Sequence, residues 1–238
     1  IALNEKSYLK TTLSYSADGI DEDVYKIKTT KINNTQGEFL RDSIGDKVLN
    51  YKSRIQNWTY RGAVTYNNKI DAKNTLQVGT KYALHGFKNS IDQSQNNADE
   101  LTSMTDFNED ISTISNFASL KHRLNEKITI IGGVHNMNVL YNQKSTIEPR
   151  LAINWQVGEN SSFSAGYGKH STMESVHNYF AQVKQADGSL TEPNKDLDLL
   201  KADHYVLGYE KRLGKNMRLK VEAYYQSLYN LPVENVDT

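Results

Sequence analysis

Apolar and polar side chains alternate along most of this chain, which places them on opposite sides of an extended backbone. The stretch "RLAINWQVGENSSFSAGYGKH", residues 150–170, shows the pattern most clearly. Its first half separates two sets of side chains: Leu151, Ile153, Trp155 and Val157 on one face, and Arg150, Asn154 and Gln156 on the other. Helical spacing is almost absent from the sequence, so the pattern predicts an all-β chain.

Nine segments carry this alternation and are predicted to be antiparallel strands of an up-and-down meander. They are residues 7–16, 54–66, 75–88, 114–124, 127–140, 147–157, 161–168, 203–213 and 217–229. Several have 10 to 14 residues, whereas strands in soluble sandwiches usually have about five or six. In segment 127–140 the facing is undecided, because Ile130 and Ile131 fall on opposite faces and Asn136 and Asn138 share the more apolar one.

Short and long connections alternate between these segments. Residues 67–74, 125–126, 158–160 and 214–216 are tight and rich in Asn, Gly and Asp, the residues that hairpin turns favour. Residues 17–53, 89–113, 141–146 and 169–202 are mostly long and polar, and we expect loops there. Counting strands in order puts every tight turn at one end and every long loop at the other, as in a transmembrane β-barrel with short periplasmic turns and longer outside loops.

Alternation by itself is also typical of a soluble antiparallel sheet with one face on a core. Strand length and loop asymmetry favour the membrane barrel instead, as do aromatic residues near the strand ends, which suit the interfacial girdles of such barrels. The alternative is a soluble β-sheet module that binds at a surface without transport. The hydrophobic fraction of 37% is low for a soluble core.

Charge and cysteine content exclude several classes of function. The chain has 28 basic and 28 acidic side chains and no cysteine, so neither nucleic-acid binding, a disulfide framework nor a thiolate metal site is predicted. No apolar run reaches the roughly 18 residues of a membrane-spanning helix. The N-terminus lacks the order of a signal peptide, and we expect either that a signal was removed or that a longer protein precedes it.

Catalytic and metal-binding motifs are missing from the sequence. The six histidines show no metal-ligand spacing, and no nucleophile motif, phosphate loop or calcium loop occurs, so we predict no enzyme, no cofactor and no metal. The most informative segment for binding is the long loop after residue 169, because loops on a rigid scaffold commonly carry recognition. Its candidate ligand-binding residues are His170, Met173, His177, Tyr179 and Phe180, which could equally pack the loop against its neighbours.

Several of these segments resemble a known family. "STIEPRLAINWQV", "SFSAGYGKHS" and "PNKDLDLLKADHYVLGYEKRLGKNMRLKVEAYYQSLYNLPVE" resemble the C-terminal half of the β-barrel in TonB-dependent outer-membrane receptors, especially those of Bacteroidetes. Glu148, Pro149 and Arg150 match a strand-entrance motif, and Tyr167 with Gly168 matches a strand-ending motif. A third motif of the family is matched only in part, by Asn194 and Leu197. The motif that follows it is matched by His204, Tyr205, Leu207, Gly208, Tyr209 and Glu210.

The resemblance implies a function as well as a fold. Members of the family have a plug domain inside a large barrel in the outer membrane of Gram-negative bacteria, and they import siderophores, vitamins, glycans or peptides with energy from TonB. The expected partners are outer-membrane lipid, such a ligand, and the TonB complex through an N-terminal region. Residues 1–238 are therefore expected to be one region of a partial barrel, without a plug and without enough strands to close, with outside loops at 17–53, 89–113 and 169–202.

Overall fold

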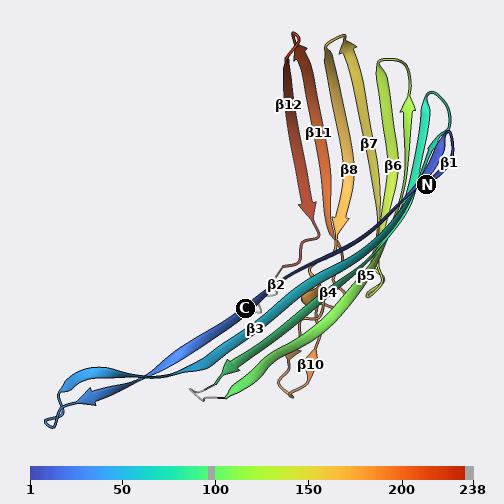
Figure 1. The fold of residues 1–238 in the computed structure, drawn as a ribbon. Coiled ribbons are helices and arrows are strands. Elements are labelled where there is room, and N and C mark those ends of the chain that lie inside the picture. Colours follow the sequence, from blue (N-terminus) through green and yellow to red (C-terminus); the bar gives the residue numbers. More distant parts are fainter. Residues whose placement is uncertain (96–99, 234–238) are drawn as a thin grey trace. The chain divides into compact units, whose positions relative to one another are not determined.

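The computed structural model describes residues 1–95 and 100–233, and long β-strands dominate it (Figure 1). Ten strands of the described residues form one sheet in the order β1-β2-β3-β4-β5-β6-β7-β8-β11-β12. Their bounds are β1 Ala2–Asn4, β2 Ser7–Asn33, β3 Phe39–Lys69, β4 Asn74–Ser94, β5 Leu101–Arg123, β6 Ile128–Val139, β7 Ser145–Gly158, β8 Ser161–Thr172, β11 Leu200–Leu213 and β12 Met217–Tyr229. The meander is open, with β1 and β12 outermost.

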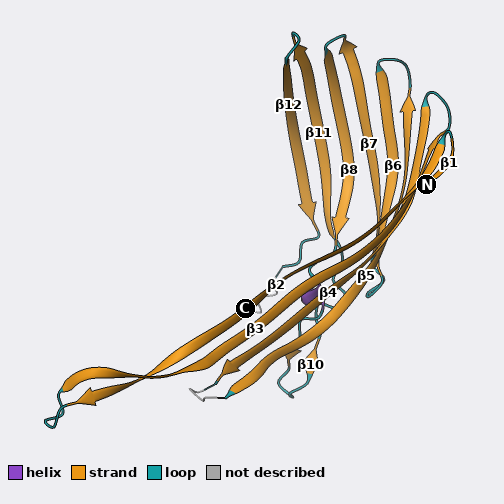
Figure 2. Cartoon of the chain, in the orientation of Figure 1, coloured by secondary structure: helices purple, strands orange, loops and turns teal. Residues whose placement is uncertain are grey.

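The strand predictions are confirmed for all nine segments, and β1 is an additional short strand. The pairs β5–β6, β6–β7, β7–β8, β8–β11 and β11–β12 are antiparallel with continuous register over most of their length. Figure 2 shows how little of the chain is helix. No helix in the described ranges is long and apolar enough to span a membrane.

Residues 17–53 and 89–113 differ from the loops that the sequence suggests. Strands β2 and β3 have 27 and 31 residues, so the connection between them is only residues 34–38. In the second segment β4 continues to Ser94 and β5 begins at Leu101. Most side chains of β2 are exposed, so this strand has no buried face. Its sequence therefore lacks the stripe of apolar residues by which the other strands are recognised.

The chain divides into two compact units. The second consists of Tyr15–Thr59 and His85–Asp110. Within it Trp58 lies against the backbone of Gly86, where a Cβ atom would come within 1.9 Å of the indole, so glycine is required there by close approach. Phe87 and Phe107 pack edge to face at 5.6 Å between centroids, and Arg54 pairs with Asp23 at 2.8 Å.

The first unit consists of Ile1–Ser14, Tyr60–Leu84 and the described residues from Ile111 onward. Among strands β7, β8, β11 and β12 the register gathers apolar side chains on one face and polar ones on the other. Register places Trp155 opposite Phe163 and Phe163 opposite Tyr209, and it places Tyr167, Tyr205 and Tyr225 in a second row. The rings touch along each row, at 4.8 Å between Phe163 and Tyr209 and at 5.1 Å between Tyr167 and Tyr205. The predicted facing of 150–157 and 217–226 is therefore confirmed.

Strand β6 also has a defined facing. Ile130 pairs with Ile153 of the apolar face, and Ile131 pairs with Ala152 on the polar face. Asn136 and Asn138 lie on the apolar side, nearer the loop end, where Asn136 donates to the carbonyl of Thr146 at 2.7 Å and Asn138 donates to Asn136 Oδ1. Their amides are thus paired at the rim of the sheet, which explains the polar residues that the alternation could not place.

The predicted tight turns are present, and side chains fix their geometry. Asp71 Oδ1 accepts hydrogen bonds from the backbone N–H groups of Lys73 and Asn74 at 2.7 and 2.8 Å, and Asn125 Oδ1 does the same for Lys127 and Ile128. The hydrogen bond from the Asn74 side chain is the main reason that the pKa of Asp71 is lowered. Gly214 has a φ of +71°, a left-handed conformation that favours glycine.

Candidate ligand-binding face

Glu148 is the centre of a hydrogen-bond network on the polar face of the first unit. Its side chain is 1% exposed. Arg150 Nη2 and His135 Nδ1 lie 2.8 and 2.9 Å from Glu148 Oε2, Thr146 Oγ1 donates to Oε1 at 3.1 Å, and Ser171 Oγ donates to the same oxygen. Donors from β6, β7 and β8 therefore replace the water that an ionised carboxylate would otherwise require.

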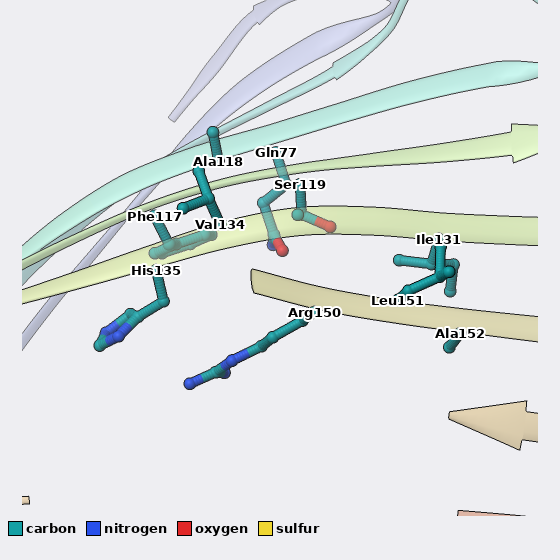
Figure 3. A pocket seen from close by; sticks show the side chains of 11 residues that line it. Gln77, Phe117, Ala118, Ser119, Ile131, Val134, His135, Arg150, Leu151 and Ala152 are labelled. Carbon is teal, nitrogen blue, oxygen red and sulfur yellow. The ribbon is translucent and has the colours of Figure 1, made fainter. Parts of the chain in front are cut away.

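The network orients His135 as well as Arg150. A carboxylate can only accept hydrogen bonds, so His135 Nδ1 carries the proton and a neutral ring presents its lone pair at Nε2. This carboxylate–imidazole arrangement fixes the tautomer and the direction of the ring. Figure 3 shows His135 and Arg150 extending to the same side from neighbouring strands.

A cavity of about 410 Å³ lies beside these two side chains. Gln77, Phe117, Ser119, Gly133, His135 and Arg150 are among the residues that line it (Figure 3). Gly133 lies close to the neighbouring strand, because a Cβ atom there would come within 2.8 Å of the Ala118 carbonyl oxygen. The lining combines an aromatic ring, an amide, an imidazole and a guanidinium, so it can contact both apolar and anionic groups of a ligand.

His170 and His204 form a second group on the same face. They belong to the adjacent strands β8 and β11, and their ring centroids are 4.6 Å apart with 60° between the planes. In the register Gly168 lies opposite both His204 and Arg150. The two histidines therefore lie diagonally across one strand pair, next to the arginine of the Glu148 network.

The other predicted ligand-binding residues belong to the connection between β8 and β11. It contains the short helix α1 (Val176–Tyr179) and the hairpin of β9 (Val183–Lys184) and β10 (Leu190–Thr191). Tyr179 is fully buried and Phe180 is half-buried; both pack against Tyr141, at 6.3 and 4.6 Å between ring centroids. Tyr179 has no exposed surface for a ligand in this arrangement, and its burial raises its pKa.

Met173 and His177 lie elsewhere in the same connection. Met173 is half-buried and His177 is exposed on α1. The structure thus joins Tyr179 and Phe180 in one aromatic cluster with Tyr141 and pairs His170 with His204 on the strands. Tyr141, His204, Glu148 and His135 were not among the predicted site residues.

Asparagine side chains anchor the base of this connection. Asn142 Nδ2 donates to the carbonyl oxygens of Lys195 and Leu197 at 3.2 and 2.8 Å, and Asn230 Nδ2 donates to the carbonyl of Leu199 at 2.7 Å. Burial acts to raise the pKa of Asp198, but hydrogen bonds from Lys201 and the Leu199 N–H outweigh it and the pKa is lowered. The connection is therefore held in place although it contains little secondary structure.

Across residues 1–95 and 100–233, no three histidine, cysteine or acidic side chains come together in a group that could hold a metal ion. What the face does hold is a fixed array of hydrogen-bonding and aromatic groups at the loop end of long strands. The arrangement suits recognition of a ligand by contact.

The sequence matches the family model described as "TonB dependent receptor-like, beta-barrel" over residues 3–238. The chain belongs to this family. As a TonB-dependent receptor β-barrel, it is part of an outer-membrane protein, and its open ten-stranded sheet is a portion of the barrel wall. The match supports the barrel over the soluble β-sheet module.

Solved structures of transporters and receptors have a similar fold at low sequence identity. The copper transporter OprC is 11% identical with a TM-score of 0.64, and 94% of this chain matches 36% of that one. The ferripyoverdine receptor of the Pseudomonas aeruginosa outer membrane is 10% identical, with a TM-score of 0.63, and 92% of this chain matches 30% of it.

The RagAB peptide importer gives a similar result. It is 12% identical with a TM-score of 0.62, and 95% of this chain matches 28% of that one. This receptor β-barrel chain thus spans about a third of the length of the neighbours that it matches. No curated protein sequence matches it.

Proposed function

We propose that this chain is a portion of the C-terminal half of the barrel in a receptor that binds a ligand at the cell surface and imports it with energy from TonB. The single observation that carries the proposal is the family match over residues 3–238. TonB itself would act through a region outside this chain. The solved neighbours carry copper, ferripyoverdine or peptides by their descriptions, and a siderophore, vitamin, glycan or peptide is the class of ligand that we propose here.

The apolar face is proposed to meet outer-membrane lipid. On β12 it runs from Met217 to Tyr225, about 27 Å along the strand at roughly 3.4 Å per residue. With a tilt of about 40°, this projects to about 20 Å, close to the apolar band of such barrels. The rows of Trp155 with Phe163 and of Tyr167 with Tyr205 are the proposed interfacial anchors.

The polar face is proposed to line the lumen, and its loop end is proposed to contact the ligand. The Glu148 network fixes Arg150 and His135 beside the cavity, while His170 lies on the next strand pair. Met173, His177, Tyr179 and Phe180 are proposed to contribute from the connection above, with Tyr179 acting only if that connection moves. Such a site binds and releases its ligand, so we propose no covalent chemistry and no cofactor. We also propose no nucleic-acid partner, because the basic and acidic side chains balance.

Uptake by cells tests the proposal. A strain that lacks the gene is compared with a complemented strain for growth on ferric siderophores, vitamin B12, oligosaccharides or peptides as the only source of the nutrient. Growth on one class should return with the gene and disappear when TonB is also deleted. Growth that persists without TonB would contradict energy-dependent import, and a folded water-soluble gene product would contradict the barrel.

Tryptophan quenching by brominated lipid tests the lipid-facing surface separately. The fluorescence that bromine quenches should decrease with Trp155→Phe, because Trp155 lies on the apolar face. The control is the same measurement with unbrominated lipid, which should leave the fluorescence of the parent and of Trp155→Phe unquenched. Brominated-lipid quenching that Trp155→Phe leaves unchanged would contradict the assignment of faces.

A further inference from the structure

The His170–His204 pair has a geometry that the general role of ligand contact does not explain. Two imidazoles from adjacent strands lie 4.6 Å apart between centroids, and both side chains are half-buried. Neither ring takes part in the hydrogen bonds of the Glu148 network. Their closeness therefore has no explanation in that network.

Gly168 makes this closeness possible. It lies opposite His204 in the register, and a Cβ atom at Gly168 would come within 3.0 Å of His170 Nε2. His170 Nε2 thus lies over Gly168, on the face of the strand pair that also carries the side chain of His204. Any larger residue at 168 would push this edge away from its present place.

The chemistry of two neighbouring imidazoles favours a transition-metal ion. Imidazole nitrogen suits Cu²⁺, Ni²⁺ and Zn²⁺, and affinity along the first-row series is highest at Cu²⁺. The positive charge of the nearby Arg150 is offset in part, because its guanidinium pairs with Glu148 at 2.8 Å. Two protein nitrogens leave the other coordination positions open for water or for donor atoms of a ligand.

We propose that His170 and His204 together bind a divalent transition-metal ion, with Cu²⁺ bound most tightly, at the loop end of the polar face. The metal would arrive as a free ion or as a complex with open coordination positions, and the two imidazoles would hold it at the mouth of the lumen. The placement of the metal at the mouth of the lumen rests on the proposed function, because it takes the polar face as the path of the ligand. Metal binding itself does not depend on transport.

Titration with Cu²⁺ alone tests the pair. The whole protein, as it is produced in the outer membrane and purified in detergent, is titrated and its electron paramagnetic resonance spectrum recorded. We expect two equatorial nitrogens in the spectrum and an apparent affinity that falls on the order of 100-fold with either His170→Gln or His204→Gln, because the second ligand of a linked pair acts at a high effective concentration. Gly168→Ala, which keeps both ligands but shifts His170, should lower the affinity by a smaller factor.

The matched control is His122→Gln. His122 lies at the opposite end of the sheet, where its Nδ1 is 2.7 Å from Asn74 Oδ1, so this substitution should leave the copper spectrum and affinity unchanged. Heat-modifiable migration shows whether each variant is folded. If the folded single variants bind Cu²⁺ as tightly as the parent, or if the parent shows one nitrogen, the proposal is wrong.

Transport is read out apart from binding. Two-nitrogen binding that is lost in the single variants supports the metal site even when no Cu²⁺, Ni²⁺ or Zn²⁺ enters cells, and that result would contradict only the proposed function for these ions. TonB-dependent uptake of another ligand, unaffected by His204→Gln and without two-nitrogen binding, would support the function and overturn the metal site.

Discussion

At the scale of single residues, Glu148 shows how a strand can hold a charge away from water. Two strands besides its own supply donors to the carboxylate, and the side chain is almost fully covered. A buried carboxylate of this kind is stable only while its partners remain in place. The network should therefore hold β6, β7 and β8 together and fix the positions of the Arg150 and His135 side chains.

Glu148→Gln tests how much the hydrogen bonds of Glu148 stabilise the fold. The amide keeps the shape but loses the charge, so we expect the free energy of unfolding to fall by about 2 kcal/mol, the range of hydrogen bonds to charged groups. Urea unfolding of the detergent-solubilised protein measures it. The control is Glu222→Gln, which removes an exposed partner of Lys220 and should cost less than about 1 kcal/mol; equal losses would contradict a special role for Glu148.

Sequence reasoning found part of this site and missed the rest. Glu148 and Arg150 belong to a motif and lie on the polar side of the alternation, but their partners His135 and Ser171 are 13 and 23 residues from Glu148. No local spacing rule predicts such contacts, because they depend on the register between strands. The same holds for His170 and His204, which are 34 residues apart in the sequence and meet only through the pairing of β8 with β11.

At the scale of elements, strands were predicted where their two faces meet different surroundings. Strands β7, β8, β11 and β12 have one apolar and one polar face, and alternation found them. The outer parts of β2 and β3 were missed because side chains on both faces are largely exposed. There the strand is stabilised by backbone pairing and by β-branched and aromatic residues. The preference of these residues for strands is a weaker signal in the sequence than the alternation of apolar and polar side chains.

The connection between β8 and β11 is the element on which recognition is proposed to depend. We expect Asn142→Ala to release its base, because two carbonyl oxygens lose their donor, and proteolysis between residues 173 and 199 should become several-fold faster while the strands remain intact. The control is Gln182→Ala, which removes only an exposed contact with Glu192 at 3.4 Å. Unchanged cleavage in a folded Asn142→Ala protein would contradict the anchoring role.

At the scale of the whole molecule, the family match and the turn chemistry together predict an orientation in the membrane. The short connections at Asp71, Asn125 and Gly214 belong to one end of the strands, and the connections at 34–38 and 173–199 belong to the other. Bacterial outer-membrane barrels have their short turns in the periplasm. Residues 34–38 should therefore face outside, and residues 214–216 should face the periplasm.

Peptide tags test this orientation. A tag inserted after Gln36 should be detected by antibody on intact cells, whereas a tag after Lys215 should be detected only after the outer membrane has been permeabilised. Both positions are exposed turns, so both insertions should be tolerated. Detection of the Lys215 tag on intact cells would reverse the orientation.

The short turns also have a consequence for motion. A turn such as 159–160 or 214–216 has few backbone torsions to rearrange and is fixed by glycine or by side-chain hydrogen bonds, so that end of the sheet has little conformational freedom. The opposite end contains the longer connection, whose stability comes from a few amide contacts and one aromatic cluster. Amide hydrogens at the loop end should accordingly exchange faster than those near the short turns. The turn end of the sheet is then the more rigid part, and the loop end is the part that can adjust its conformation.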